Sequence, residues 1–314
     1  MAKIIFMGTP DFAVPSLHAL IDTHDVVGVV TQPDKRAGRG KKLRFSPVKE
    51  AALAANIPVY QPKSLRTKTA VSPLREWNAD VIIVAAFGQI LRPFLLEMPP
   101  HGCLNVHASL LPRWRGASPI QHAILSGDAE SGVTLMQMDK GLDTGGMFVS
   151  EAIPLHADET AVSLHDRLAA LGADMMRRHL DAILAGNLTA IPQENGASTY
   201  APMITKADGA LNWEQTAVNL DRRVRAMTPW PGAFTHWQGK SLKILKARPL
   251  AEQWGATAGQ VLHDAGRKIT AVCTNDGMLQ LEIVQLAGKR PTAIADFMRG
   301  RPQFAGAVLG KSGE

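Results

Sequence analysis

The sequence predicts an α/β fold, in which a doubly wound, mostly parallel sheet is followed by a small C-terminal β-barrel. Two observations carry this prediction. Over the first 186 residues, short apolar runs alternate with helical patterns, as in the βαβ units of a parallel sheet. Beyond residue 207, short alternating strands are separated by turns such as QGK, DAGR and NDG, which is typical of antiparallel β-structure.

The N-terminal elements follow from this alternation. KIIFMG, residues 3–8, predicts the first strand, and a helix is expected next because Thr9 and Pro10 suit an N-cap and a first helical position. The segment ADVIIVAAFG, residues 79–88, predicts a buried strand because it is apolar on both faces. The remaining expected elements are strands at 25–32, 58–62 and 102–109, and helices at 46–57 and 160–186.

Chain length favours two domains, because 314 residues exceed the roughly 100–200 of a typical single domain. Residues 187–207 are polar and rich in turn formers, which indicates a linker. The predicted domains are therefore an N-terminal domain at 1–186 and a C-terminal domain at 208–314.

The composition indicates a soluble, cytoplasmic protein that does not bind a membrane. Cys103 and Cys273 are far apart and belong to no CxxC pair, which argues against a disulfide framework or a zinc site and fits a reducing compartment. The apolar run at the start is too short for a signal peptide, and no segment reaches about 18 uninterrupted apolar residues. We expect a monomer and no bound metal.

The positive charge is concentrated in the last third of the chain. Residues 200–314 contain 15 Lys and Arg against 9 Asp and Glu, whereas the first 199 residues contain 19 of each kind. The whole excess of +6 therefore belongs to the C-terminal part. Such an excess indicates a polyanionic partner, although a solvated basic surface is the alternative.

Three polar residues are candidates for catalysis. Asn105 and His107 are two residues apart on a predicted strand, so both side chains point to the same face. Ligands bind at the carboxyl ends of strands in open parallel sheets, and these two residues lie near that end. Asp143 lies in a turn between Gly141 and Gly145. The alternative is that Asn105 caps a turn, His107 is a hydrogen-bonded core histidine and Asp143 fills an Asx-turn.

Several other chemistries are excluded by their missing motifs. GTPDFA follows the first strand in place of GxGxxG, and GRGKK lacks the spacing and the Ser or Thr of a phosphate loop. The sequence also contains no HExxH and no GxSxG. Asn, His and Asp without a Ser or Cys nucleophile suit acid–base and oxyanion catalysis between two reactants that both come from outside.

The stretch NVHASLLPRWRGASPI, followed by GLDTG, closely resembles the folate-dependent formyltransferases, whose signature is HxSLLPxxxG with an upstream Asn and a downstream Asp. The segments IIFMGTPDFA, TQPDKRAGRGKK, FGQIL, WPGAF and GKSLKI extend the resemblance over the chain, to the family members that formylate initiator methionyl-tRNA. It implies a formyltransferase-type, Rossmann-like domain and an OB-like C-terminal barrel that binds tRNA.

The implied reaction moves the formyl group of 10-formyltetrahydrofolate to the α-amine of methionine on initiator methionyl-tRNA. Asn105 and His107 would stabilise the oxyanion, and Asp143 would orient His107 and relay the proton. The folate would be held by two segments and by the backbone around Asp139. These folate-binding residues are Phe87, Gly88, Gln89, Ile90, Leu91, Ser109, Leu110, Leu111, Pro112 and Asp139.

The basic segment KRAGRGKKLRFSPVK, residues 35–49, is the expected tRNA contact. It carries seven positive side chains and no acid, and it leaves the second predicted strand at its carboxyl end. By resemblance it touches the acceptor stem, and we expect it to be mobile without tRNA; the alternative is a solvated charge run. The residues expected to bind tRNA are Arg36, Arg39, Lys41, Lys42 and Arg44.

Two other functions stay open at this point. One is a formyltransferase that acts on a sugar nucleotide or a small amine, which a substrate panel would separate. The other is a nucleic-acid-binding protein that has kept the fold without activity. The presence of all three candidate catalytic residues argues against the second.

Overall fold

The computed structural model describes residues 1–37 and 42–310. The chain forms two compact units. Unit 1 is made of Met1–Pro119, Glu130–Pro154 and His165–Ala201. Unit 2 is made of Ile120–Ala129, Leu155–Leu164 and Pro202–Glu314. Each unit therefore draws on more than one segment of the chain, and the linear domain boundaries at 186 and 207 stay a prediction.

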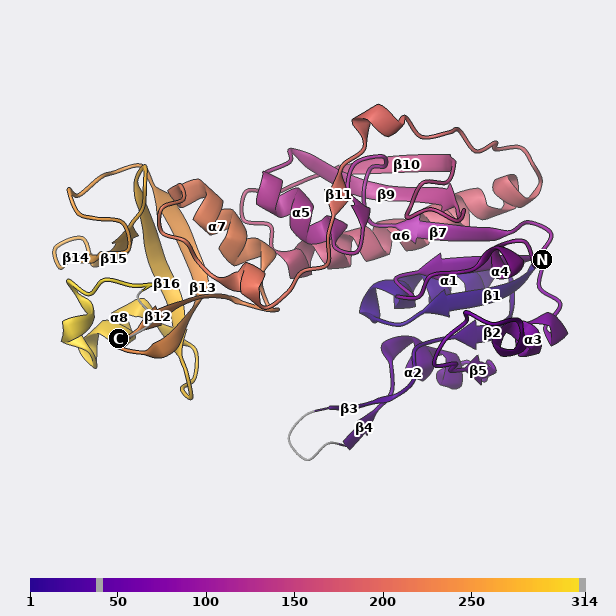
Figure 1. Ribbon diagram of the computed structural model, residues 1–314, viewed down its shortest axis with the longest axis horizontal. Helices are drawn as coiled ribbons and strands as arrows, with labels where there is room; N and C mark the ends of the chain where they lie inside the picture. The colour runs from indigo at the N-terminus through magenta and orange to yellow at the C-terminus, as the bar shows by residue number, and fades with distance from the viewer. Residues whose placement is uncertain (38–41, 311–314) are drawn as a thin grey trace. The chain divides into compact units, whose positions relative to one another are not determined.

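A seven-stranded sheet forms the centre of unit 1, in the order β10-β9-β7-β6-β1-β2-β5 (Figure 1). The neighbouring strands β5, β2, β1, β6 and β7 are all parallel, and β9 runs antiparallel to both β7 and β10. The sheet confirms the predicted mostly parallel fold. Its strands are β1 (Lys3–Gly8), β2 (Asp25–Val30), β5 (Val59–Tyr60), β6 (Val81–Ala85), β7 (Cys103–His107), β9 (Glu130–Gln137) and β10 (Met147–Pro154).

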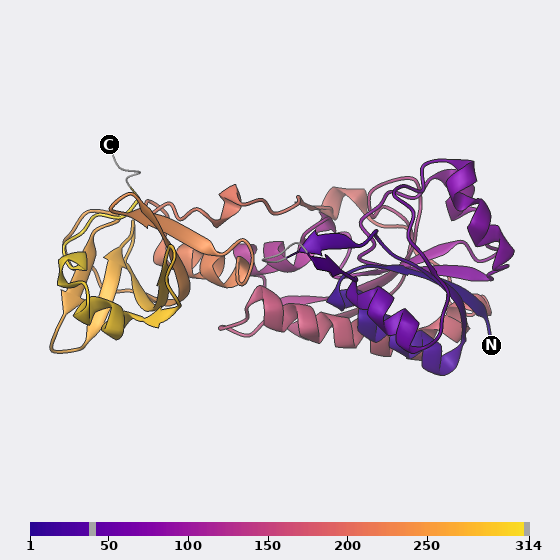
Figure 2. The ribbon, with the colours of Figure 1, turned by 90° about the horizontal axis from the view of Figure 1, so that it is seen from below.

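Helices cover both faces of this sheet, as Figures 1 and 2 show. On one face, Ile82 packs in a cluster with Leu74 and Leu95 from two short helices. On the other face Gly172 lies so close to the sheet that a Cβ there would be 2.7 Å from Val106 Cγ1. Between these layers every residue of β6 and β7 is buried. The helices are α1 (Val14–Thr23), α2 (Pro47–Ala54), α3 (Lys68–Glu76), α4 (Pro93–Leu96) and α6 (Ala161–Leu184).

The first helix begins later than the sequence predicts. Thr9 and Pro10 are followed by a 3-10 turn, Asp11–Ala13, and α1 starts only at Val14. Pro15 lies in the first turn of α1, where its missing N–H costs no helical hydrogen bond. The N-cap expected at Thr9 is therefore wrong, because the proline fixes the start of the helix further along the chain.

Unit 2 contains an antiparallel sheet in the order β12-β13-β16-β15-β14, with β17 paired to β16. Trp237, Phe297 and Phe304 form its aromatic core, with ring centroids 5.1 to 5.7 Å apart. The expected C-terminal β-domain is confirmed as an antiparallel sheet. The elements are α5 (Pro119–Ser126), α7 (Ala217–Ala226), β12 (Ala233–Trp237), β13 (Lys240–Leu250), β14 (Val261–Asp264), β15 (Ile269–Cys273), β16 (Met278–Leu286), β17 (Thr292–Ala293) and α8 (Ile294–Arg299), with 3-10 turns at Ala207–Gly209 and Pro302–Phe304.

Two small strand pairs lie outside these sheets. β3 (Lys35–Ala37) and β4 (Lys42–Arg44) form an antiparallel hairpin within the basic segment, and 38–41 between them lie outside the described residues. β8 (Arg115–Gly116) pairs in parallel with β11 (Tyr200–Ala201), just after a 3-10 turn at Asn195–Ala197. Residues 187–201 of the predicted linker thus belong to unit 1. Over 1–37 and 42–310, no helix is long and apolar enough to cross a membrane.

Candidate active site

The end of β7 places Asn105 and His107 at the junction of the parallel and antiparallel parts of the sheet. Asn105 pairs with Val84 of β6 on one side and with Met136 of β9 on the other. The two side chains are buried, with 9% and 6% of their residues' surface exposed. Within the part of the chain that the structure describes, the Asn105 amide forms no hydrogen bond. A buried amide in that state is available to an incoming group.

His107 lies between a carbonyl and a carboxylate. Its Nε2 is 3.1 Å from the carbonyl oxygen of Trp114. Because a carbonyl only accepts, Nε2 carries the hydrogen of this bond. Its Nδ1 is 3.8 Å from Oδ2 of Asp143, which is beyond direct hydrogen bonding but within ion-pair range. The ring is thereby oriented with Nδ1 toward the acid.

Asp143 occupies the turn between β9 and β10, and its backbone is left-handed with φ of 53°. Its Oδ2 accepts a 2.8 Å hydrogen bond from the backbone N–H of Gly116. Gly145 lets this turn fold tightly, because a Cβ there would lie 1.9 Å from the carbonyl oxygen of Gln137. The structure thus brings together the three residues that the sequence singles out, from β7 and from a turn 36 positions further along the chain.

Asp139 organises the same turn from its exposed side. Its Oδ1 accepts hydrogen bonds from the N–H of Gly141 at 2.9 Å and from Oγ1 of Thr144 at 2.7 Å. The Asp139 carboxylate is thus occupied within its own turn, and the backbone nearby is what could meet a ligand.

The segment after β7, residues 109–112, is fixed by a residue that the sequence reasoning missed. Thr134 of β9 is fully buried, and its Oγ1 donates to the carbonyl of Ser109 at 2.7 Å. The same oxygen accepts from the N–H of Leu111 at 3.2 Å. The only signal in the sequence is a hydroxyl inside the apolar run GVTLM.

The side chains of this segment point in different directions. Ser109 Oγ donates to the carbonyl of Arg113 at 2.6 Å, so it closes its own loop. Leu110 packs over Gly132, where a Cβ would lie 2.5 Å from Leu110 Cδ2. Leu111 is buried and Pro112 is partly exposed.

The segment 87–91 divides between core and surface. Phe87 and Leu91 are part of the core cluster under the sheet. Gln89 accepts from the N–H of Leu65 at 3.0 Å, which ties it to a neighbouring loop. Gly88 is exposed, and Ile90 is 66% exposed. Of the expected folate-binding residues in this segment, only Gly88 and Ile90 are therefore exposed to solvent.

The basic hairpin is anchored at its base. Lys49 donates to Oδ2 of Asp34 at 2.6 Å and to Oε1 of Gln61 at 2.8 Å. The hydrogen bond from Lys49 also lowers the pKa of Asp34. Lys49 is therefore held by unit 1, whereas Arg44 is exposed. Arg36 and Lys42 lie in the paired strands, and Arg39 and Lys41 lie outside the described residues.

Two further residues at the site come from the predicted linker. Gln193 donates from Nε2 to the carbonyl oxygens of Asp143 and Gly145, both at 2.8 Å. Thr199 Oγ1 accepts a 2.8 Å hydrogen bond from the N–H of Trp114, the residue that bonds His107. Nothing in the polar sequence of this segment distinguishes these two residues from their neighbours.

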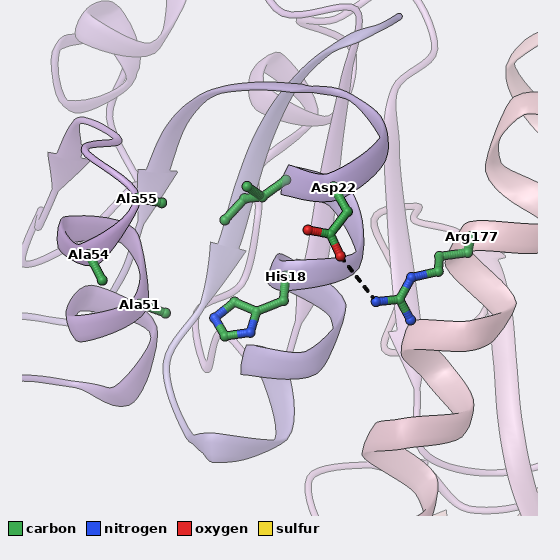
Figure 3. Close-up of a pocket in the computed structure, with 7 residues that line it drawn as sticks. His18, Asp22, Ala51, Ala54, Ala55 and Arg177 are labelled. Atoms are coloured by element: carbon green, nitrogen blue, oxygen red, sulfur yellow. Dashed lines mark hydrogen bonds and ion pairs between the residues drawn. The ribbon is translucent and has the colours of Figure 1, made fainter.

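A hollow of about 390 Å³ lies elsewhere, between α1, α2 and α6 (Figure 3). Ala51, Ala54 and Ala55 form one wall, and an ion pair between Asp22 and Arg177 at 3.4 Å closes the other side. None of the candidate catalytic residues lines it. No group of three or more His, Cys, Asp or Glu in the described ranges, 1–37 and 42–310, could hold a metal ion.

Comparison with known proteins decides the family. Residues 2–180 match the formyl transferase family, and residues 203–302 match the formyl transferase C-terminal domain. A methionyl-tRNA formyltransferase of Alkaliphilus oremlandii is 44% identical over 98% of this chain and 100% of its own length. The chain belongs to the methionyl-tRNA formyltransferase family. It is therefore an enzyme, a one-carbon transferase of translation initiation.

Further relatives agree with this membership. The methionyl-tRNA formyltransferase of Hydrogenovibrio crunogenus is 48% identical over 98% of this chain and 98% of its own length. Among solved structures, the sugar 3N-formyl transferase WlaRD has a TM-score of 0.66 at 22% identity, over 92% of this chain and 99% of that one. HypX of Aquifex aeolicus has a TM-score of 0.62 at 18% identity, over 95% of this chain and 48% of that one. These two distant likenesses concern the fold alone.

Proposed function

We propose that this enzyme transfers the formyl group of 10-formyltetrahydrofolate to the α-amine of methionine on initiator methionyl-tRNA, by direct attack of the amine. The observation that carries the mechanism is the convergence of Asn105, His107 and Asp143 at one buried strand end, with Nδ1 of His107 and Oδ2 of Asp143 3.8 Å apart. The family membership supports the acceptor, since the relatives named above are methionyl-tRNA formyltransferases.

The amine is the only nucleophile that the reaction needs. An α-amino group titrates near about 7.7–8.0, so part of it is neutral at cellular pH. Its nitrogen attacks the formyl carbon, and the electrons of the carbonyl double bond move to the oxygen. The C–N10 bond then breaks, N10 gains a proton, and tetrahydrofolate leaves. No covalent enzyme intermediate is required.

The three residues have distinct roles in this proposal. The Asn105 amide and an N–H of His107 donate to the oxyanion, and one such donor is typically worth about 2.7–4 kcal/mol in the transition state. The Nε2–H of His107 is already bonded to the carbonyl of Trp114, so Nδ1 is the nitrogen that takes the proton lost by the amine. The resulting Nδ1–H then donates a hydrogen bond to the oxyanion. Asp143 orients the ring, stabilises its positive charge and relays the proton, directly or through water.

We place the folate along 109–112, 87–91 and the turn at Asp139. Thr134 fixes the backbone of the first segment, which supports a rigid wall for a flat ring. Solved neighbours of the same fold were captured with folates: WlaRD in the presence of 5-N-formyl-THF and HypX in complex with tetrahydrofolic acid. The formyl donor proposed here belongs to the same chemical class.

We place the tRNA acceptor stem at the hairpin β3–β4 and the tRNA backbone on the C-terminal β-domain. The ion pair between Lys49 and Asp34 fixes the chain at the base of the hairpin, which supports this placement. Phosphate contacts of this kind hold the tRNA without reading its sequence.

The proposal is tested by formylation of charged initiator tRNA, with elongator methionyl-tRNA and a panel of amino sugars and small amines alongside. Initiator tRNA should be the best substrate, and a preference for an amino sugar would overturn the proposed acceptor. Asn105→Ala, His107→Ala and Asp143→Ala should each lower kcat by about a hundredfold or more, because each removes a transition-state interaction. His101→Ala, an exposed histidine just before β7, is the control and should leave kcat unchanged.

A further inference from the structure

Gln193 is an unusual residue for a segment that looks like a linker. Its neighbours Pro192 and Glu194 are exposed, whereas Gln193 itself is 9% exposed. A buried amide must have its donors and acceptor satisfied by partners, or it costs stability. The partners of Gln193 therefore tell what the residue does.

All the partners of Gln193 belong to the two loops of the candidate site. Its two Nε2 hydrogens go to the carbonyls of Asp143 and Gly145, at 2.8 Å each. Its Oε1 accepts from Nε of Arg115 at 2.9 Å. Two carbonyls require donors and a guanidinium requires an acceptor, so these partners fix which way the amide faces.

The turn that Gln193 holds needs such support. Asp143 has a left-handed backbone, a conformation that a non-glycine residue keeps only when its surroundings impose it. The bond to the Asp143 carbonyl fixes the peptide that carries the catalytic carboxylate. The bond to Arg115 links the same amide to β8, whose Gly116 N–H binds that carboxylate.

We propose that Gln193 is a positioning residue, which holds the Asp143 turn and the 114–116 loop at the separation that the reaction needs. This inference rests on the role proposed above for Asp143. Displacing a reacting group by about 1 Å is enough to reduce a rate by about a hundredfold. Gln193 thus acts on kcat through Asp143, without touching either substrate.

The test compares kcat and KM of Gln193→Leu with those of the wild type and of Asn195→Ala. Leucine is apolar, ends one atom short of the glutamine amide and removes all three hydrogen bonds. Asn195 also bonds Arg115, at 3.0 Å, but contacts neither carbonyl of the turn, so it is the matched control. We expect Gln193→Leu to lower kcat about tenfold or more, with both KM values nearly unchanged, and Asn195→Ala to leave kcat unaffected. Equal kcat in Gln193→Leu and the wild type would overturn the inference.

A double variant separates this inference from the proposed function. In an Asp143→Ala background, Gln193→Leu should cause no further loss of kcat, because the group that it positions is gone. A full further loss in that background would show that Gln193 acts on the fold generally and would overturn the inference. Normal kcat in Asp143→Ala alone would instead overturn the proposed role of Asp143. If Gln193→Leu fails to fold, Gln193→Glu takes its place, since it keeps the acceptor for Arg115 and lacks both donors.

Discussion

At the scale of single residues, the candidate site is built on backbone that is costly to maintain. Trp114 and Asp143 both have positive φ, 63° and 53°, which makes the bulky Trp114 a true outlier. Such positions cost about 1–3 kcal/mol each and persist only where the surroundings hold them. Here the holding groups are side chains from other segments, namely Thr199 for Trp114 and Gln193 for Asp143.

Thr134 gives the first prediction at this scale. Thr134→Val removes the buried hydroxyl and leaves the carbonyl of Ser109 and the N–H of Leu111 without that partner. Leaving buried polar groups unpaired costs about 1–3 kcal/mol, so the urea midpoint should fall. The loosened segment should also raise KM for the folate more than KM for the tRNA. Ser150→Ala is the control, because Ser150 is an exposed partner of the same hydroxyl; equal changes in both variants would contradict the prediction.

The sequence indicates the candidate catalytic residues but not the residues that support them, and the reason is physical. Asn105 and His107 stand out because strand periodicity places them on one face and because amide and imidazole are rare in a buried strand. Thr134 and Gln193 act through hydrogen bonds to residues 23 to 78 positions away. Nothing in local composition encodes such a bond, so only the folded structure reveals it.

At the scale of elements, ion pairs tie β10 to α6 within unit 1. Arg178 of α6 donates from Nη1 and Nη2 to the two carboxylate oxygens of Glu151 on β10, at 2.7 Å each. The same guanidinium binds Asp174 one turn earlier in the helix at 2.8 Å. A bidentate contact of this kind fixes the angle between strand and helix more firmly than a single bond.

This contact predicts how stability depends on pH. Arg178 holds the pKa of Glu151 below its usual range, chiefly through the hydrogen bond. A depressed carboxyl pKa contributes stability that is complete above the unfolded-state pKa of about 4.3 and is lost as pH falls through the folded-state value. Glu151→Gln should therefore cost about 0.5–1 kcal/mol near neutral pH and flatten the fall in urea midpoint between about pH 5 and 3. Parallel pH profiles of variant and wild type would contradict this. Glu97→Gln, an exposed acid after α4, is the control.

The hairpin gives a second prediction at this scale. Arg39→Ala or Lys41→Ala should lose about 1–3 kcal/mol in kcat/KM for initiator tRNA if the hairpin reads a base edge at the unpaired stem end, and less if it touches only phosphate. The measurement compares initiator tRNA with a variant whose first acceptor position is paired. Equal losses on both tRNAs indicate a plain electrostatic anchor. Unchanged kinetics with both tRNAs would show that the segment is a solvated charge run that does not contact tRNA. Lys63→Ala, an exposed lysine outside the hairpin, is the control.

Element prediction succeeds where one signal dominates. The buried strand at 79–88 is confirmed as β6, because every residue from Val81 to Ala85 is apolar and buried. Helix α3 escapes the sequence reasoning because Pro73 lies inside it. Strand β10 escapes as well, since MFVSEAIP mixes half-buried and exposed positions at the sheet edge. Its place depends on pairing with β9, which local pattern does not specify.

At the scale of the whole molecule, the net positive charge and the candidate catalytic residues lie in different stretches of the chain. Asn105, His107 and Asp143 all lie within the first 199 residues, where acidic and basic residues balance. The excess of +6 lies in residues 200–314. This division suits a transferase with two unlike substrates, a small folate and a long polyanion, because each makes contacts of a different kind.

One end of the C-terminal sheet carries three of these positive charges. The turn before β13 and the turn after β16 meet there, since the N–H of Ala287 donates to the carbonyl of Ser241 at 2.9 Å. Lys240 begins β13, Lys289 and Arg290 lie on the turn after β16, and all three are exposed. Exposed cations at one end of a sheet are suited to phosphates of a nucleic-acid backbone.

The last prediction is that reversing these three charges weakens tRNA binding and nothing else. Lys240→Glu, Lys289→Glu and Arg290→Glu, combined, should raise KM for initiator tRNA strongly, with KM for the folate unchanged. Each lost phosphate contact also removes about 0.9 from the slope of log binding constant against log salt, so the variant should depend less on salt between about 50 and 200 mM. The matched control reverses Lys63, Lys68 and Arg75 around α3, which are equally exposed and belong to unit 1. Because net charge changes equally in both variants, a general field effect would raise KM in both, and only a local contact would separate them. Equal KM values for initiator tRNA in the two triple variants would therefore show that the excess positive charge of the C-terminal part forms a solvated surface.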